Sequence, residues 1–147
     1  MTVARRYVHP ALPPALVTPR IEVTVLCTTD AETSAALSAA AVFAHKLNTV
    51  IRLVAFVVVP YPLDLTQPSV APSFTVDRCT ALVQGQNLDA NIQICYCRDL
   101  EAGVGQALGS KSLVVIGRKP HWWALRENRL ARLVRSVQHD LLVVDVR

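Results

Sequence analysis

The chain has 147 residues, of which 52% are hydrophobic and 18% charged, so it can bury a core and form one globular domain. This composition excludes an intrinsically disordered chain, and no apolar stretch approaches the ~20 residues that a membrane-spanning helix needs. Residues 1–20 contain prolines and no continuous apolar run, unlike a signal peptide. We expect a cytoplasmic protein without a membrane span, with a flexible Pro-rich tail over residues 1–20 and one domain over residues 21–147.

The four cysteines are too few and too scattered for a disulfide framework. Cys95 and Cys97 flank Tyr96 on a predicted strand, where alternate residues share a face. Two interpretations are open: a redox or metal pair, or two small side chains packed under a helix. No further ligands stand at suitable spacing for zinc, which favours packing. We therefore expect no metal site.

The first half of the domain predicts strands and helices in alternation. The first strand is Ile21–Cys27, and Asp30 is placed to cap the Ala-rich helix that follows. The next strand, Val50–Val59, is an almost unbroken aliphatic run, which is typical of a central parallel strand covered on both faces. Prolines make residues 60–72 a loop, and Ser73 is placed to cap a second helix.

The second half continues the alternation. Asn91–Cys97 is a predicted strand, and Asp99 is placed to cap a short helix that contains two glycines. Ser112–Ile116 is the next strand, Asn128 is placed to cap the last helix, and Leu141–Val146 is the last strand. With right-handed crossovers, this order predicts an α/β fold: a three-layer α/β/α sandwich with a five-stranded parallel sheet.

Ligands of such sheets bind beyond the carboxyl ends of the strands, where the strand order reverses. This rule places Asp30, the stretch after Val57, Asp99 and the loop that begins at Gly117 around one crevice. The sequence has no G-x-G-x-x-G, no P-loop, no H-E-x-x-H and no recognisable Ser-His-Asp grouping. We therefore expect no catalytic activity.

Four segments, taken in order, resemble the universal stress protein family: "VTVLCTTDAETSAAL", "IRLVAFVVVP", "SLVVIGRK" and "LVRSVQHDLLVVDV". They are similar to that family's first strand with its aspartate and helix, its second strand, its fourth strand entering the nucleotide loop, and its last helix and strand. The resemblance covers about residues 21–147 and implies the same sandwich, of the adenine nucleotide alpha hydrolase-like kind. It also implies a homodimer through the C-terminal strand, which is apolar and expected at a sheet edge.

Nucleotide-binding members of that family carry Gly-x2-Gly-x9-Gly-Ser/Thr after the fourth strand, where glycines let backbone N–H groups approach phosphates. Gly117 matches the first glycine, but Pro120 stands at the second position and has no N–H. The final pair falls on Leu130–Ala131, or on Glu127–Asn128 if the loop is three residues shorter. The resemblance therefore implies a branch with a degenerate nucleotide motif, for which no cofactor is expected.

The alternative is a divergent ATP- or AMP-binding protein that uses Arg and Lys in place of the glycines. The resemblance assigns Asp30 and the backbone of Val57 to the nucleotide, whereas a helix cap and sheet core would also explain them. The basic residues are equally explained as a solvated helix face. The candidate nucleotide- or anion-binding residues are Asp30, Val57, Gly117, Arg118, Lys119, Arg126, Asn128 and Arg129.

Trp122 and Trp123 are the only tryptophans, and both lie in the basic loop. Aromatic rings beside Arg or Lys are typical of contact surfaces, so the pair predicts a protein-partner site; alternatively, one ring closes over the crevice. No nucleic-acid recognition motif is present, and we expect no specific nucleic-acid partner. The sequence thus predicts a dimeric regulatory or interaction module.

Overall fold

The computed structural model describes residues 5–9, 22–61, 63–65, 71–108, 112–119, 125–136 and 140–146, of which 5–9, 112, 125–127 and 136 are described by their backbone alone. In chain order the elements are β1 (Arg5–His9), β2 (Glu22–Leu26), α1 (Asp30–Leu47), β3 (Ile51–Val58), α2 (Pro72–Gly85), β4 (Ala90–Cys97), α3 (Leu100–Ala107), β5 (Ser112–Arg118), α4 (Leu125–Ser136) and β6 (Asp140–Asp145). Among these residues, no helix is both long and apolar enough to cross a bilayer.

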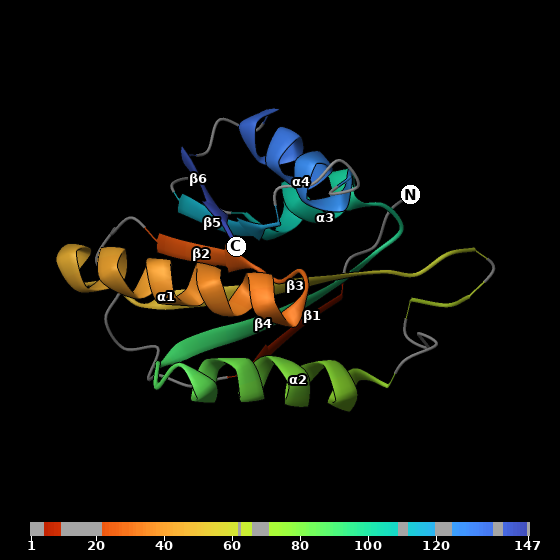
Figure 1. The fold of residues 1–147 in the computed structure, drawn as a ribbon. Coiled ribbons are helices and arrows are strands. Elements are labelled where there is room, and N and C mark those ends of the chain that lie inside the picture. Colours follow the sequence, from red (N-terminus) through yellow and green to blue (C-terminus); the bar gives the residue numbers. More distant parts are fainter. Residues whose placement is uncertain are drawn as a thin grey trace.

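The strands form one sheet in the order β1-β4-β3-β2-β5-β6 (Figure 1). Strands β2 to β6 are parallel, which confirms the predicted five-stranded parallel sheet, and β6 lies at an edge as expected. The sequence pattern does not predict β1, which pairs antiparallel with β4 and lies within the predicted tail. Among the described strands, the five residues of β1 pair only with this distant strand, and no local pattern points to it.

The helices cover both faces of the sheet. The first core cluster joins the sheet to α1 and α2, and the second joins it to α3 and α4, so the molecule is the predicted three-layer sandwich (Figure 1). Strand β3 lies between β4 and β2, and its residues contribute to both clusters, as the aliphatic run Val50–Val59 predicts. Central burial of this kind requires apolar residues on both faces of a strand.

Cys95 and Cys97 are fully buried in the second cluster and carry free thiols. A Cβ on Gly103 of α3 would lie 2.8 Å from the Cys97 sulfur, so the helix packs tightly over this part of β4. The packing interpretation of the two cysteines is therefore supported. The described residues contain no group of three or more His, Cys, Asp or Glu able to hold a metal ion.

One predicted cap is confirmed, since the Asp99 carboxylate accepts a hydrogen bond from the Ala102 N–H at 2.8 Å. The cap of α1 is Thr29, one residue before the predicted Asp30, and its hydroxyl accepts from the Glu32 N–H at 3.4 Å. Both threonine and aspartate are common helix caps, so residue type alone does not choose between Thr29 and Asp30. Asp30 is instead the first helical residue.

Two further cap predictions are wrong. Helix α2 begins at Pro72 and has no side-chain cap, so Ser73 lies inside its first turn. Proline suits the first helical position because that residue's N–H has no partner within the helix. Helix α4 begins at Leu125, which leaves Asn128 within the helix and free to bond elsewhere.

Candidate functional site

The strand order reverses between β2 and β5, the place where open α/β sheets bind ligands. Gly117 belongs to β5 rather than to a loop, and it packs against the start of α1. A Cβ on Gly117 would lie 2.6 Å from the carbonyl carbon of Glu32 and 3.0 Å from its Cα. The glycine is therefore required for close packing of helix on strand, independently of any ligand.

Glu32, whose backbone contacts Gly117, is also a buried acidic residue. It is 3% exposed, and its Oε2 has no hydrogen-bond partner among the described residues. The sequence does not predict the burial of Glu32, because an acidic residue in the first turn of a helix is usually exposed to solvent and interacts there with the helix dipole.

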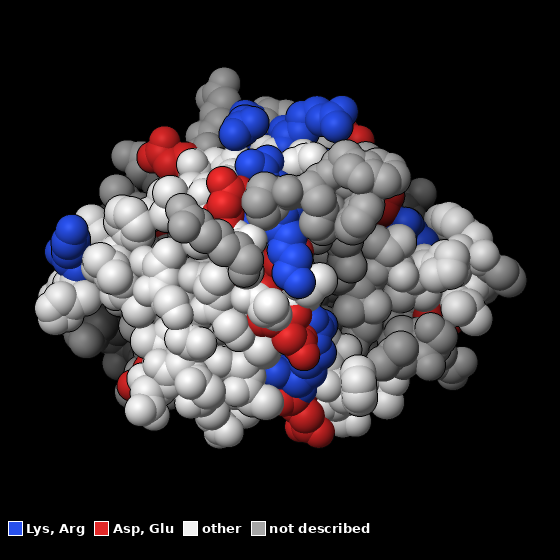
Figure 2. Space-filling model, viewed as in Figure 1, with Lys and Arg blue, Asp and Glu red and all other residues white. Residues whose placement is uncertain are grey.

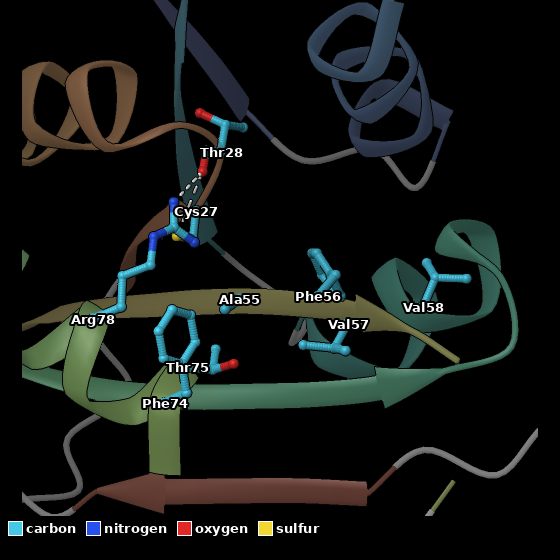
Figure 3. Close-up of a pocket in the computed structure, with 9 residues that line it drawn as sticks. All are labelled: Cys27, Thr28, Ala55, Phe56, Val57, Val58, Phe74, Thr75 and Arg78. Atoms are coloured by element: carbon cyan, nitrogen blue, oxygen red, sulfur yellow. Dashed lines mark hydrogen bonds between the residues drawn. The ribbon is translucent and has the colours of Figure 1, made fainter. Parts of the chain in front are cut away.

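A cavity of about 400 Å³ opens beyond the carboxyl ends of β2 and β3, beside the first half of α2 (Figure 3). Its walls combine strand backbone, apolar side chains and one cationic group. The lining residues are Cys27, Thr28, Ala55, Phe56, Val57, Val58, Phe74, Thr75 and Arg78. The size and mixed lining are those of a small-molecule site.

Arg78 crosses this cavity from α2 to the start of α1 (Figure 3). Its Nε donates to Asp30 Oδ1 at 2.7 Å, and its Nη2 donates to the carbonyl oxygen of Thr28 at 2.7 Å. The guanidinium thus engages both the aspartate implied by the resemblance and the Thr28 carbonyl before α1. No sequence inference singled out Arg78, although it is the only basic residue of α2 and adjoins the buried stripe Val76, Cys79 and Val83.

The peptide groups at the end of β3 point in alternating directions. The Val59 N–H donates to the Cys97 carbonyl oxygen of β4 at 2.9 Å. Because the peptide groups of every second residue face the same neighbouring strand, those of Val57 also face β4. Those of Val58 face the side of β2, which has already ended. A ligand in the cavity would therefore meet the Val58 backbone, while the half-buried Val57 contributes its side chain.

Arg118 is engaged away from this cavity. Its guanidinium donates to Asp145 Oδ1 at 3.2 Å through Nη2 and at 3.4 Å through Nε, and to Asn128 Oδ1 at 3.0 Å through Nη1. Two of the predicted anion-binding residues, Arg118 and Asn128, are therefore partners that fasten β5, β6 and α4 together. Lys119 and Arg129 are exposed.

The remaining predicted site residues are only partly covered. Trp122 and Trp123 lie outside the described residues, as does the side chain of Arg126. On α4, Arg129, Arg132 and Arg135 are exposed, while Leu130 and Val134 are buried, as expected for an amphipathic helix. Figure 2 shows basic side chains over α4 at the top of the view and, below them, a band where basic and acidic side chains lie next to each other.

Cys27 lies at the end of β2 and lines the cavity. The pKa of its thiol is lowered from 9.0 to about 6, mainly by a hydrogen bond from Cys79, with further lowering by Arg78 and Thr33; burial and Asp30 act in the opposite direction. The pKa of Cys79 is raised above its ordinary value, chiefly by that same hydrogen bond and then by burial. The pair therefore favours a thiolate at Cys27 and a thiol at Cys79.

No protein-family model matches the sequence, and no curated protein is significantly similar to it. Among solved structures, the chain is similar to the crystal structure of a protein from the universal stress protein family from Burkholderia pseudomallei. The TM-score is 0.52 at 17% sequence identity, over 84% of this chain and 94% of that chain. This chain has the universal stress protein fold.

Within this universal stress protein fold, the candidate site residues separate into two groups. Asp30 and Val57 lie at the cavity, Asp30 through its ion pair with Arg78. Gly117 lies against α1, and Arg118 bonds toward β6 and α4. The predicted crevice is thus mainly a cavity at β2, β3 and α2, with Arg78 as its principal polar side chain.

Proposed function

We propose that this chain is a cytoplasmic, homodimeric regulatory or interaction module with the universal stress protein fold, which acts without catalysis and does not bind ATP in the usual way. The observation that carries this proposal is the 2.7 Å ion pair between Asp30 and Arg78. Asp30 is the residue that the family resemblance assigns to the nucleotide. With its carboxylate held by Arg78, it offers a ligand fewer free acceptor positions.

The phosphate side of the site supports the same proposal. Gly117 is covered by the backbone of Glu32, which leaves no room for a ligand against the glycine. Arg118, the first basic residue that could replace the missing glycines, bonds to Asp145 and Asn128 instead. Pro120 supplies no N–H at the position of the second glycine.

The alternative, a divergent ATP- or AMP-binding protein, is favoured by the cavity itself. A volume of about 400 Å³ accommodates a purine ring, and the Val58 backbone faces it. In this alternative Arg78 would turn from Asp30 toward a phosphate, releasing the carboxylate for the sugar. Arginine suits that role because its planar fork matches phosphate oxygens.

Two measurements decide between these functions. The purified chain is denatured and the released small molecules are identified by mass spectrometry, and ATP and AMP are titrated into the native chain by calorimetry. We expect no adenine nucleotide and no heat at millimolar concentration. Stoichiometric nucleotide, or saturable binding, would overturn the leading proposal in favour of the alternative.

The variant Arg78→Ala tests whether the ion pair between Asp30 and Arg78 is what prevents nucleotide binding. If the ion pair is what withdraws Asp30 from ligands, Arg78→Ala should show measurable nucleotide binding that Arg78→Ala/Asp30→Ala lacks. The matched control is Arg98→Ala, because Arg98 bonds to the carbonyl oxygens of Val59 and Leu63 in the neighbouring loop and does not line the cavity. In the alternative function, Arg78→Ala would instead weaken the binding seen in the unmodified chain.

Two interaction sites complete the proposal. The homodimer would form through β6, whose only neighbour among the described strands is β5. A protein partner would bind at Trp122 and Trp123, the aromatic pair of the basic loop. Aromatic residues of this kind dominate binding energies when they are buried at an interface.

A further inference from the structure

The cavity borders a pair of thiols that the proposed function does not use. Cys27 lines the cavity from the end of β2 and is 5% exposed, while Cys79 of α2 is fully buried and does not line it. Both residues belong to the first core cluster, and hydrogen bonding between the two thiols is the largest influence on the pKa of each. Two cysteines far apart in the sequence are thus in contact, and only one of them borders the cavity.

Several groups around Cys27 stabilise a negative charge on its sulfur, whereas burial, Asp30 and the Thr28 carbonyl oxygen, 3.9 Å from the sulfur, oppose it. Besides Cys79, the Thr33 hydroxyl donates to the Cys27 sulfur at 3.8 Å. The Arg78 guanidinium lies beside it at the cavity wall (Figure 3). Cys27 also lies two residues before Thr29, the N-cap of α1, at the helix end whose dipole favours anions. Asp30 opposes these effects, but its carboxylate is paired with Arg78.

This environment is the one that makes cysteines reactive. Thiolates, rather than thiols, attack oxidants and electrophiles, and they occur at helix N-termini and beside Arg in partly accessible places. The pKa of Cys27, lowered to about 6, is consistent with thiolate at neutral pH. Cysteines that sense oxidants combine such a thiolate with a second cysteine close enough to form a disulfide.

Cys95 and Cys97 provide an internal contrast. Both are fully buried in the second core cluster, on the side of the sheet covered by α3 and α4. Neither lines the cavity. The four cysteines of the chain therefore divide into one pair at a cavity and one pair within the core.

We propose that Cys27 is a peroxide-reactive cysteine and that Cys79 is its resolving partner. The Cys27 thiolate attacks one oxygen of hydrogen peroxide, the O–O bond breaks, and hydroxide leaves and is protonated to water. The Cys79 sulfur then attacks the Cys27 sulfenic acid, the S–O bond breaks, and a second water leaves with the Cys79 proton. Two thiols are thereby oxidised by two electrons to one disulfide, and one peroxide is reduced to two waters.

The disulfide would join the end of β2 to α2 beside the cavity. Forming it requires the two sulfurs to approach to a bond of ~2.05 Å. It would also remove the thiolate that faces Arg78. Thiol reductants would reverse the bond by exchange. This modification does not depend on whether a nucleotide binds.

The test uses the whole reduced chain and hydrogen peroxide at pH 7. After brief treatment with one equivalent, the remaining thiols are alkylated and the peptides are mapped by mass spectrometry. We expect one disulfide, between Cys27 and Cys79, that is lost on adding a thiol reductant. In Cys79→Ser, dimedone should label Cys27 as a sulfenic acid. The matched control Cys95→Ser should form the disulfide as the unmodified chain does.

A second measurement needs no variant. The rate of alkylation of Cys27 by iodoacetamide, followed against pH in the unmodified folded chain, should rise with a midpoint near 6. A midpoint near 9, the ordinary value, would overturn the proposal. So would peroxide oxidation spread evenly over the four cysteines, or a folded Cys79→Ser chain in which dimedone does not label Cys27.

Discussion

The backbone of Glu32 occupies the space that a side chain on Gly117 would need. A Cβ there would lie 2.6 Å from the Glu32 carbonyl carbon and 3.0 Å from its Cα. Backbone atoms in the first turn of a packed helix cannot move aside as a flexible side chain does. Gly117 therefore fixes how closely α1 approaches β5, and this role explains the residue without a phosphate.

We predict that Gly117→Ala destabilises the fold by about 1–3 kcal/mol or more, because α1 or β5 must shift to admit the methyl group. The measurement is the free energy of unfolding in urea. Gly105→Ala is the matched control, since a Cβ on Gly105 of α3 meets no atom within 4 Å. That change should stabilise the helix by about 0.5–1 kcal/mol. Equal effects of the two substitutions would contradict the packing role.

The helix caps give a second prediction. Asp99→Ala should cost about 1 kcal/mol, because the Asp99 carboxylate holds the Ala102 N–H at 2.8 Å. Thr29→Ala should cost less, since its bond to the Glu32 N–H is 3.4 Å long. Thermal unfolding of each variant measures both losses. Asp99→Asn serves as control because asparagine caps about as well as aspartate; a loss as large as that of Asp99→Ala would show that the cap is not the cause.

The sequence predicts the fold well because its signals are local. Strands β3 and β5 contain aliphatic runs long enough to identify, and the central position of Val50–Val59 follows from a run in which Arg52 is the only polar residue. The amphipathic stripe of Leu130 and Val134 likewise marks the buried face of α4. Strand–helix alternation then leaves few topologies open, since crossovers are right-handed.

Features set by distant contacts are not predictable in this way. Strand β1 exists because it pairs with β4, and five residues give no pattern of their own. Thr29 and Asp30 are both capping residues, so the sequence alone does not choose between them. Asn128 has the composition of a cap but lies within α4, where it bonds to Arg118 from another element.

The candidate site, like the fold, has some features that the local sequence predicts and others that depend on distant contacts. The sequence correctly places Val57 at the end of a strand, and Asp30 close to the cavity that Val57 lines. It does not reveal Arg78, because pairing of α2 with the start of α1 depends on how two helices lie over one face of the sheet. An isolated arginine beside a buried stripe was the available signal. Neither the contact of Cys27 with Cys79 nor the burial of Glu32 has any local signature.

The Cys27 thiolate predicts a pH dependence of stability. The pKa of this group is about 6 in the folded chain and 9.0 ordinarily, so between these values the unfolded chain binds more protons. Stability should therefore rise as pH increases from 6 to 9. Above pH 9 the stability gained from Cys27 rises no further. There the raised pKa of Cys79 begins to favour the unfolded chain, because the Cys79 thiol ionises at a lower pH in the unfolded chain than in the folded chain. Urea unfolding across this range measures the slope.

The comparison with variants isolates this contribution from that of other groups. Cys27→Ser should lose the extra rise in stability between pH 6 and 9, whereas Cys95→Ser should retain it. Arg78 and Asp30 remain in both variants, so their charges affect each curve alike. Parallel curves for the unmodified chain and Cys27→Ser would contradict a thiolate at Cys27.

The open edge of β6 gives the last prediction. The Val146 N–H donates to the Arg118 carbonyl oxygen at 2.8 Å, so alternate N–H groups of β6, including that of Leu142, face β5. The Val143 N–H faces the open edge, where a second chain would pair. Val143→Pro should thus keep the fold and convert a dimer into a monomer, as measured by light scattering at ~100 μM. Val143→Ala, which retains the N–H, should stay dimeric, and Leu142→Pro should unfold. A dimeric Val143→Pro chain, or a monomeric unmodified chain, would exclude pairing through β6.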